Sequence, residues 1–178
     1  MTNRRLVAVF LVALACFVPR VASAQDRAPA DLAVSYSFVR FLEGEGYNVP
    51  GGWLVSFSAP VAPLTAVVAE VAGNYRRGLP YGEDDDWLTL HTFMAGARVS
   101  GRGRVRPFAQ FLVGAARGAW AGDSEARFAI EPGGGVDVAL GTRTAARVGV
   151  GLPIVYPGEG TFKMFRFHAG VVFALGAR

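Results

Sequence analysis

Residues 166–175 read Arg-Phe-His-Ala-Gly-Val-Val-Phe-Ala-Leu and alternate two kinds of side chain with a period of two. One face is wholly apolar and consists of Phe167, Ala169, Val171, Phe173 and Leu175. The other face is small or charged and consists of Arg166, His168, Gly170, Val172 and Ala174. This pattern is typical of a β-strand. A strand of this composition suits a wall between lipid and a narrow polar lumen, so the stretch predicts a transmembrane β-barrel.

Seven earlier segments show the same alternation. Together with the last segment they give eight predicted strands, at 32–41, 52–59, 65–76, 87–99, 105–117, 128–140, 144–156 and 164–176. Long connections (42–51, 77–86, 118–127 and 157–163) alternate with short ones (60–64, 100–104 and 141–143). In transmembrane barrels the short turns face the periplasm and the long loops face outside. The sequence therefore predicts an all-β fold, an eight-stranded antiparallel up-and-down transmembrane β-barrel.

A soluble calyx, in which the apolar residues point inward, is the alternative architecture. The polar face of the predicted strands separates the two, because it is small and contains Ala33, Ser35, Ser37, Ser56, Ser58, Ala72, Asn74, Gln110, Gly133, Gly135, Gly149 and Gly151. A solvent-exposed face would carry lysine and glutamate instead. We therefore expect this face to line a crowded lumen and the apolar face to meet lipid.

Residues 1–24 have the organisation of a secretory signal peptide. Arg4 and Arg5 precede an apolar run at 6–18, which is too short to span a bilayer, and Ala22-Ser23-Ala24 fits signal peptidase. We expect export through the periplasm and cleavage before Gln25, which N-terminal mass analysis tests. Residues 25–178 then form a single outer-membrane β-barrel domain. A lipoprotein signal ending at Cys16 is the minor alternative.

Composition excludes several functional classes. Three arginines and no acid leave with the signal peptide, so the formal charge falls from +4 to +1. Nucleic-acid binding requires clustered basic residues, and the mature chain has no such surplus. The chain's single cysteine, Cys16, lies in the signal peptide, so disulfides and thiol chemistry are excluded. We expect no cofactor and no nucleic-acid partner.

Three motifs carry a family resemblance, and they are Arg106-Pro107-Phe108-Ala109-Gln110, Pro132-Gly133-Gly134-Gly135-Val136-Asp137 and His168-x-Gly170-x-x-Phe173-x-Leu175. Over the whole mature chain the sequence resembles the small eight-stranded outer-membrane β-barrel proteins. The resemblance implies the outer membrane of a Gram-negative bacterium, contact with lipid and lipopolysaccharide, and recognition of the last strand by the barrel-assembly machinery. The ending Gly176-Ala177-Arg178 departs from the usual terminal aromatic residue.

Ionisable side chains predicted to face the lumen form the best-defined cluster, namely Glu70, Glu131, Asp137, Arg147, Arg166 and His168. A hairpin centred on residue 142 would place Asp137 opposite Arg147. Charges in a narrow lumen must be paired, so we interpret the cluster as a structural salt-bridge plug. A narrow ion-conducting channel is an alternative, although eight-stranded barrels are normally filled by their own side chains.

The two histidines raise a third possibility, a lipid A-modifying enzyme. Either His91 or Thr92 must face lipid, and we expect Thr92 there because a hydroxyl costs less than an imidazole. His91 and His168 would then both point inward, and neither has the His-x-Ser pattern of the lipid A deacylases. Two distant histidines are also a weak zinc signal. We therefore expect neither an enzyme nor a metal site.

Acidic residues gather in the second long connection, as Glu83, Asp84, Asp85 and Asp86, and Trp120 stands alone in the third. The acids indicate a solvated surface or, less simply, a site for divalent cations. Trp120 could anchor a partner or rest on the barrel rim. The sequence thus predicts a non-enzymatic outer-membrane β-barrel with a structural envelope role or a surface-interaction role through its extracellular loops.

Replacing residues 83–86 with serine and glycine tests the cation hypothesis. Loops without packing tolerate change, so assembly should stay intact. If the carboxylates bind calcium or magnesium that bridges to lipid headgroups, the variant should lose any ion-dependent rise in its thermal unfolding midpoint. An unchanged ion response would leave only the solvated surface, and failed assembly would place a strand boundary within the segment.

Overall fold

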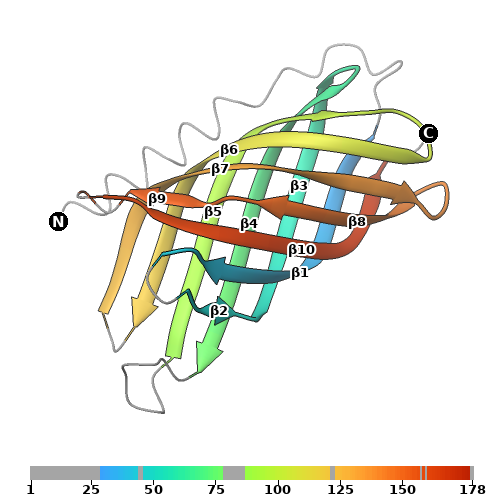
Figure 1. The fold of residues 1–178 in the computed structure, drawn as a ribbon. Coiled ribbons are helices and arrows are strands. Elements are labelled where there is room, and N and C mark those ends of the chain that lie inside the picture. The colour runs from blue at the N-terminus through green and yellow to red at the C-terminus, as the bar shows by residue number, and fades with distance from the viewer. Residues whose placement is uncertain are drawn as a thin grey trace.

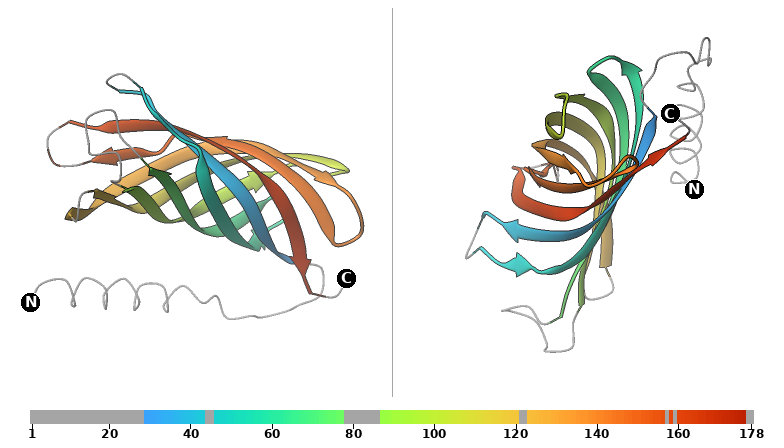
Figure 2. Two further views of the ribbon diagram at one scale, coloured as in Figure 1. Left: turned by 90° about the horizontal axis from the view of Figure 1, so that it is seen from below. Right: turned by 90° about the vertical axis from the view of Figure 1, so that its right-hand side faces the viewer.

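The computed structural model is a single antiparallel sheet that closes on itself (Figure 1). It describes residues 29–43, 46–77, 87–120, 123–156, 158 and 160–176. The strands are β1 (Ala30–Phe41), β2 (Asn48–Val49), β3 (Gly51–Ala62), β4 (Thr65–Arg77), β5 (Trp87–Ser100), β6 (Val105–Trp120), β7 (Asp123–Ala139), β8 (Thr144–Gly151), β9 (Ile154–Tyr156) and β10 (Phe162–Leu175). Neighbours in the sheet follow the chain, and β1 also pairs with β10 along its whole length, which closes the ring (Figure 2).

Prolines divide two of the eight predicted strands. Pro50 separates β2 from β3, and the pairing with β1 shifts by one residue across it. Pro153 separates β8 from β9, but the register with β7 and β10 continues unchanged. Proline has no N–H to donate, so it interrupts a ladder without ending the strand's course. The ten pieces therefore form an eight-stranded ring, and the predicted fold is confirmed.

Two predicted loops are wrong. The first connection is short, because β2 begins at Asn48 rather than at residue 52. The third, predicted at 118–127, is largely a hairpin in which Trp120 pairs with Asp123. Cross-strand polar contacts keep this hairpin paired, since Arg117 donates to Ser124 Oγ at 2.9 Å. Residues 78–86 lie outside the described part of the chain.

Outside β5, side chains divide between the two faces of the ring as predicted. Large apolar residues on the outer face are 37–53 % exposed, and they include Val34, Tyr36, Trp53, Phe57, Val67, Phe93, Val99, Phe111, Val113, Val148, Val150, Phe167, Val171 and Phe173. The inner face buries Ala33, Ser35, Ser37, Ser56, Ser58, Ala72, Asn74 and Gln110. Such an apolar outer band fits lipid and excludes the soluble calyx. Among the described residues, no helix has the length and hydrophobicity to cross a membrane.

The predicted orientation of β5 is wrong. Thr92 is buried, and its hydroxyl accepts a hydrogen bond from Arg166 Nη2 at 3.0 Å. His91 instead lies outside, where its Nε2 contacts the Tyr75 hydroxyl at 3.1 Å. In the lumen the Thr92 hydroxyl finds a charged partner, Arg166, and on the outer face the His91 imidazole finds the Tyr75 hydroxyl. The prediction compared only the cost of exposing each side chain to lipid, and it was wrong because these partners decide the orientation of β5.

The lumen has an apolar half that the sequence did not indicate. Ten buried residues form this apolar cluster, namely Val39, Val49, Val68, Leu90, Met94, Leu112, Ala116, Ala129, Val155 and Met164. Leu90, Val155 and Met164 lie near the loop end of the barrel, whereas Val68 lies toward the turn end of β4. The rings of Phe41 and Tyr47 stack beside this cluster, with centroids 4.3 Å apart. The small polar residues and the charges occupy the remaining part, toward the short turns. The two ends of the lumen thus differ in chemistry.

Gly135 is required by the close packing of β7, β8 and Phe108. A Cβ at this position would overlap the carbonyl oxygen of Val148 and lie 2.8 Å from Phe108 Cζ. We expect Gly135→Ala to lower the free energy of unfolding by about 2 kcal/mol, because backbone cannot yield as a side chain can. Urea unfolding in lipid vesicles measures this change.

Gly118 is the matched control, since a Cβ there would meet nothing within 4 Å. Gly118→Ala should leave stability unchanged or slightly higher, because glycine weakens a strand. Equal losses for the two variants would contradict the packing of Gly135.

Candidate functional site

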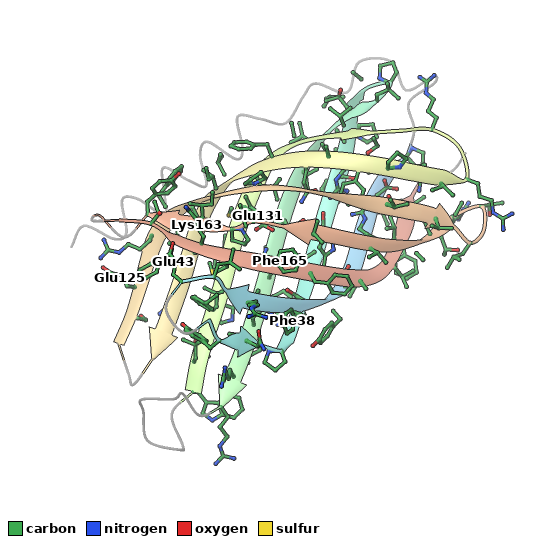
Figure 3. The ribbon with its side chains drawn as sticks, viewed as in Figure 1. Phe38, Glu43, Glu125, Glu131, Lys163 and Phe165 are labelled. Carbon is green, nitrogen blue, oxygen red and sulfur yellow. The ribbon has the colours of Figure 1, made fainter. Side chains whose placement is uncertain are left out.

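The centre of the lumen is built around Arg166 of β10, which is fully buried. Its Nη1 lies 2.8 Å from Glu131 Oε2 on β7 and 3.9 Å from Glu70 Oε1 on β4. Glu131 is labelled in Figure 3. Its Nη2 donates to Thr92 Oγ1 on β5. One guanidinium therefore links four strands, β10, β7, β4 and β5, and the partners of Arg166 lie far from it in sequence. Burying such a charge is tolerated only because carboxylates compensate it.

A second ion pair lies nearer the turn end of the barrel. Asp137 and Arg147 are direct partners in the register of β7 and β8. Arg147 donates from Nε to Asp137 Oδ1 at 2.7 Å and from Nη2 to Asp137 Oδ2 at 2.8 Å. This two-pronged geometry is the strong form of the arginine–carboxylate pair. The hairpin centred on residue 142 places these two residues together.

Arg98 belongs to the same constellation, although sequence reasoning did not include it. Its guanidinium donates twice to Gln110 Oε1, at 3.0 Å from Nε and 2.7 Å from Nη2, and once to Ser56 Oγ at 3.2 Å. Gln110 in turn donates to Glu70 Oε2 at 3.5 Å. The amide thus links Arg98 to the central cluster. Assigning Thr92 inward would have revealed Arg98, because the two residues share a face of β5.

Phe108 separates two of these arginines. The guanidinium carbon of Arg98 lies 4.7 Å from the ring centroid, and that of Arg147 lies 4.9 Å from it. An aromatic face attracts a cation, and the attraction strengthens when water is excluded. The ring therefore holds two like charges close together near the turn end.

His168 is buried but takes no part in the ion pairs. Its Nδ1 has no hydrogen-bond partner among the described residues. Space for the imidazole comes from Gly149, where a Cβ would overlap His168 Nε2. Of the six predicted lumen residues, five join ion pairs and His168 only fills volume.

The remaining predicted residues are the acidic segment 83–86 and Trp120. Glu83, Asp84, Asp85 and Asp86 lie outside the described residues. Trp120 ends β6 and pairs with Asp123 through the backbone, and its side chain is not described. The described residues bring together no group of three histidines or carboxylates that could hold a metal ion.

His91 belongs to a polar aromatic group on the outer face near the loop end. Trp53 Nε1 donates to the Tyr75 hydroxyl at 3.2 Å, and that hydroxyl contacts His91 Nε2. Gly73 makes room for the group, since a Cβ there would lie 2.8 Å from both Trp53 Nε1 and the Tyr75 hydroxyl. Amphipathic rings with a bonded polar edge suit the headgroup level of a membrane.

Several solved structures are similar to this chain. Ail, the attachment invasion locus protein of Yersinia pestis, is 11 % identical with a TM-score of 0.58, and the match covers 83 % of this chain and 100 % of Ail. Neisserial surface protein A is 11 % identical with a TM-score of 0.66, covering 82 % and 97 % of the two chains. The N-terminal β-barrel domain of Pseudomonas aeruginosa OprF is 10 % identical with a TM-score of 0.51, covering 83 % and 100 %.

A further structure of Ail, in complex with the heparin analogue sucrose octasulfate, is 14 % identical with a TM-score of 0.58 and covers 83 % of this chain and 100 % of that one. Comparison with protein-family models and with curated protein sequences gives no match. The structural likenesses establish that this chain has the fold of the small eight-stranded outer-membrane β-barrels.

A double-mutant cycle at Asp137 and Arg147 tests the second ion pair. Asp137→Asn alone or Arg147→Gln alone should lower the free energy of unfolding by about 3 kcal/mol, because each leaves an opposite charge buried. The double variant should lose less than the sum of the two single losses. Strictly additive losses, measured by refolding in detergent, would show that the two side chains are not coupled.

Proposed function

We propose that this protein is a non-enzymatic outer-membrane β-barrel that acts at the cell surface through contacts made by its loop end. The observation that carries the proposal is the filled lumen. The apolar cluster blocks the loop half, and the ion pairs around Arg166 block the middle. A barrel filled in this way offers its two ends and its outer band as surfaces for function.

The loop end offers a projecting hairpin as a contact surface. β7 begins at Asp123, but its pairing with β9 reaches only to Phe128, so residues 123–127 extend beyond that neighbour (Figure 1). Arg127 pairs with Glu125 on this extension, and both side chains are exposed in part. A paired hairpin holds its side chains in place, which reduces the entropy lost when a partner binds.

Cationic side chains on the outer face near the loops support contact with anionic lipid. The exposed residues of this kind are Arg40, Arg77, Arg117 and Lys163, the last labelled in Figure 3. Lipopolysaccharide carries phosphate groups at this level of an outer membrane, and guanidinium and ammonium groups bind phosphate. We propose lipopolysaccharide as a lipid partner, with the barrel-assembly machinery reading β10 during insertion.

Sulfated or phosphorylated surfaces are a further class of partner. Ail has been solved with a heparin analogue, a polyanion, and shares the fold of this chain. The four outer cations near the loops would attract such a ligand, whereas Glu83 to Asp86 would repel it. The kind of surface partner therefore depends on the balance between these four cations and the four acids of residues 83–86.

The outward position of His91 bears on the enzymatic alternative. The imidazole could reach lipid, but its Nε2 contacts Tyr75, and no described hydrogen bond joins it to a serine or threonine. A hydrolase nucleophile requires a base within hydrogen-bond reach. We therefore retain the non-enzymatic proposal, and lipid A mass spectra from cells with and without the protein should be identical.

Planar-bilayer recording tests the filled lumen directly. The inserted protein should give no conductance steps, because neither the apolar cluster nor the buried ion pairs leave a water-filled path. Insertion must be verified in the same membrane by an independent assay, such as protease protection. Reproducible ohmic steps from the purified protein would contradict the proposal and favour the ion-channel alternative.

A further inference from the structure

A vestibule of about 1010 Å³ opens at the turn end of the barrel. Its wall includes residues from all three short turns and from the adjoining strand ends. Five arginines line it, Arg98, Arg102, Arg106, Arg143 and Arg147, against two carboxylates, Asp31 and Asp137. The wall therefore carries a formal excess of three positive charges, whereas the mature chain as a whole is nearly neutral.

Two of these arginines, Arg98 and Arg147, are buried next to the ring of Phe108. Arg147 is fully engaged by Asp137. Arg98 has only neutral direct partners, Gln110 and Ser56, and forms no ion pair with a described carboxylate. Its compensation from Glu70 passes through the Gln110 amide. A buried guanidinium without a direct counter-ion is costly, and an anion in the vestibule would lower that cost.

Arg106 is the second residue of β6 and lies nearer the mouth of the vestibule than Arg98 and Arg147 do. Its Nη2 lies 4.0 Å from Asp137 Oδ2, an oxygen that already accepts a hydrogen bond from Arg147. Its Nε is buried and has no hydrogen-bond partner among the described residues. One carboxylate is thus shared by two arginines, and the Nε donor of Arg106 has no partner among the described residues.

The vestibule is closed on its inner side. Beyond Arg98 and Arg147 lie the cluster around Arg166 and then the apolar half of the lumen. A ligand must therefore enter and leave at the turn end. A cavity that is open at one end and lined by an excess of one charge concentrates counter-ions more strongly than a flat surface does.

We propose that the vestibule binds a small phosphate-bearing anion. Guanidinium groups approach from several strands and turns, which suits the many acceptor oxygens of a phosphate better than a single planar carboxylate. The volume leaves room for an organic group attached to the phosphate. The source is either a soluble phosphate ester or a phospholipid headgroup of the leaflet at the turn end. This site is separate from the loop-end contacts proposed above.

Binding of inorganic pyrophosphate to the protein in phosphatidylcholine nanodiscs tests the site. Isothermal titration at constant ionic strength should show saturable binding. Arg106→Gln and Arg102→Gln should each weaken pyrophosphate binding about tenfold, because each removes a charged hydrogen-bond donor with which the protein would bind the ligand. Arg106 only reaches Asp137 at 4.0 Å, an acid that Arg147 already holds with two hydrogen bonds, and no ion pair is described for Arg102. Folding should therefore be preserved, and thermal unfolding without ligand checks this.

Arg104→Gln is the matched control, because Arg104 lies in the same turn as Arg102 but does not line the vestibule. This variant should bind pyrophosphate as the wild type does. A loss equal to that of Arg102→Gln would reduce the effect to general surface charge and overturn the site. Absence of saturable binding in the wild type would overturn it as well.

A second arm identifies the source of the phosphate. The titration is repeated in nanodiscs that also contain phosphatidylglycerol, for the wild type and for Arg106→Gln. Weaker pyrophosphate binding in the wild type alone would assign the vestibule to a lipid headgroup. Unchanged wild-type binding would assign it to a soluble phosphate ester. This arm decides only the source of the phosphate, because the first titration already tests the site itself through Arg106→Gln.

Discussion

Closing eight strands into a ring leaves a lumen so narrow that side chains must fill it. Every charge placed there loses water and needs a partner on another strand. Arg166 meets this constraint by joining Glu131, Glu70 and Thr92, and Arg147 meets it with Asp137. Glycine follows from the same requirement, because Gly135 and Gly149 leave the space that Phe108 and His168 occupy. Packing, charge pairing and the glycine-rich strands of this protein thus share one cause.

The filling changes along the barrel axis, and the two ends acquire different properties. Near the loops, apolar residues such as Leu90 and Met164 fill the lumen and need no polar partner. In the middle, the ion pairs close it at the cost of desolvation. At the short turns the side chains no longer meet, and an arginine-rich vestibule remains. This difference between the two ends is the basis for proposing surface contacts at one end and anion binding at the other.

Period-two alternation allowed most of this fold to be predicted, because a strand between lipid and lumen has only two environments. It also placed Asp137 opposite Arg147, since a tight hairpin fixes the register. Alternation failed in β5, where both His91 and Thr92 are polar and only their partners, Tyr75 and Arg166, decide the phase. That error concealed Arg98. The extended β6–β7 hairpin was missed because residues 118–127 are mostly small or polar and lack a clear apolar alternation. The apolar half of the lumen was missed because it brings together residues from strands that are distant in sequence.

The most direct test compares two neighbouring valines of β10 in the native chain. Val171 is 37 % exposed and faces outward, whereas Val172 is 2 % exposed and faces the lumen. In nanodiscs with methyl-labelled protein, nuclear Overhauser effects to the lipid acyl chains should appear for the Val171 methyl groups and be absent for those of Val172. Acyl-chain contacts at Val172, or equal contacts at both residues, would contradict the division between a lipid-facing band and a filled lumen.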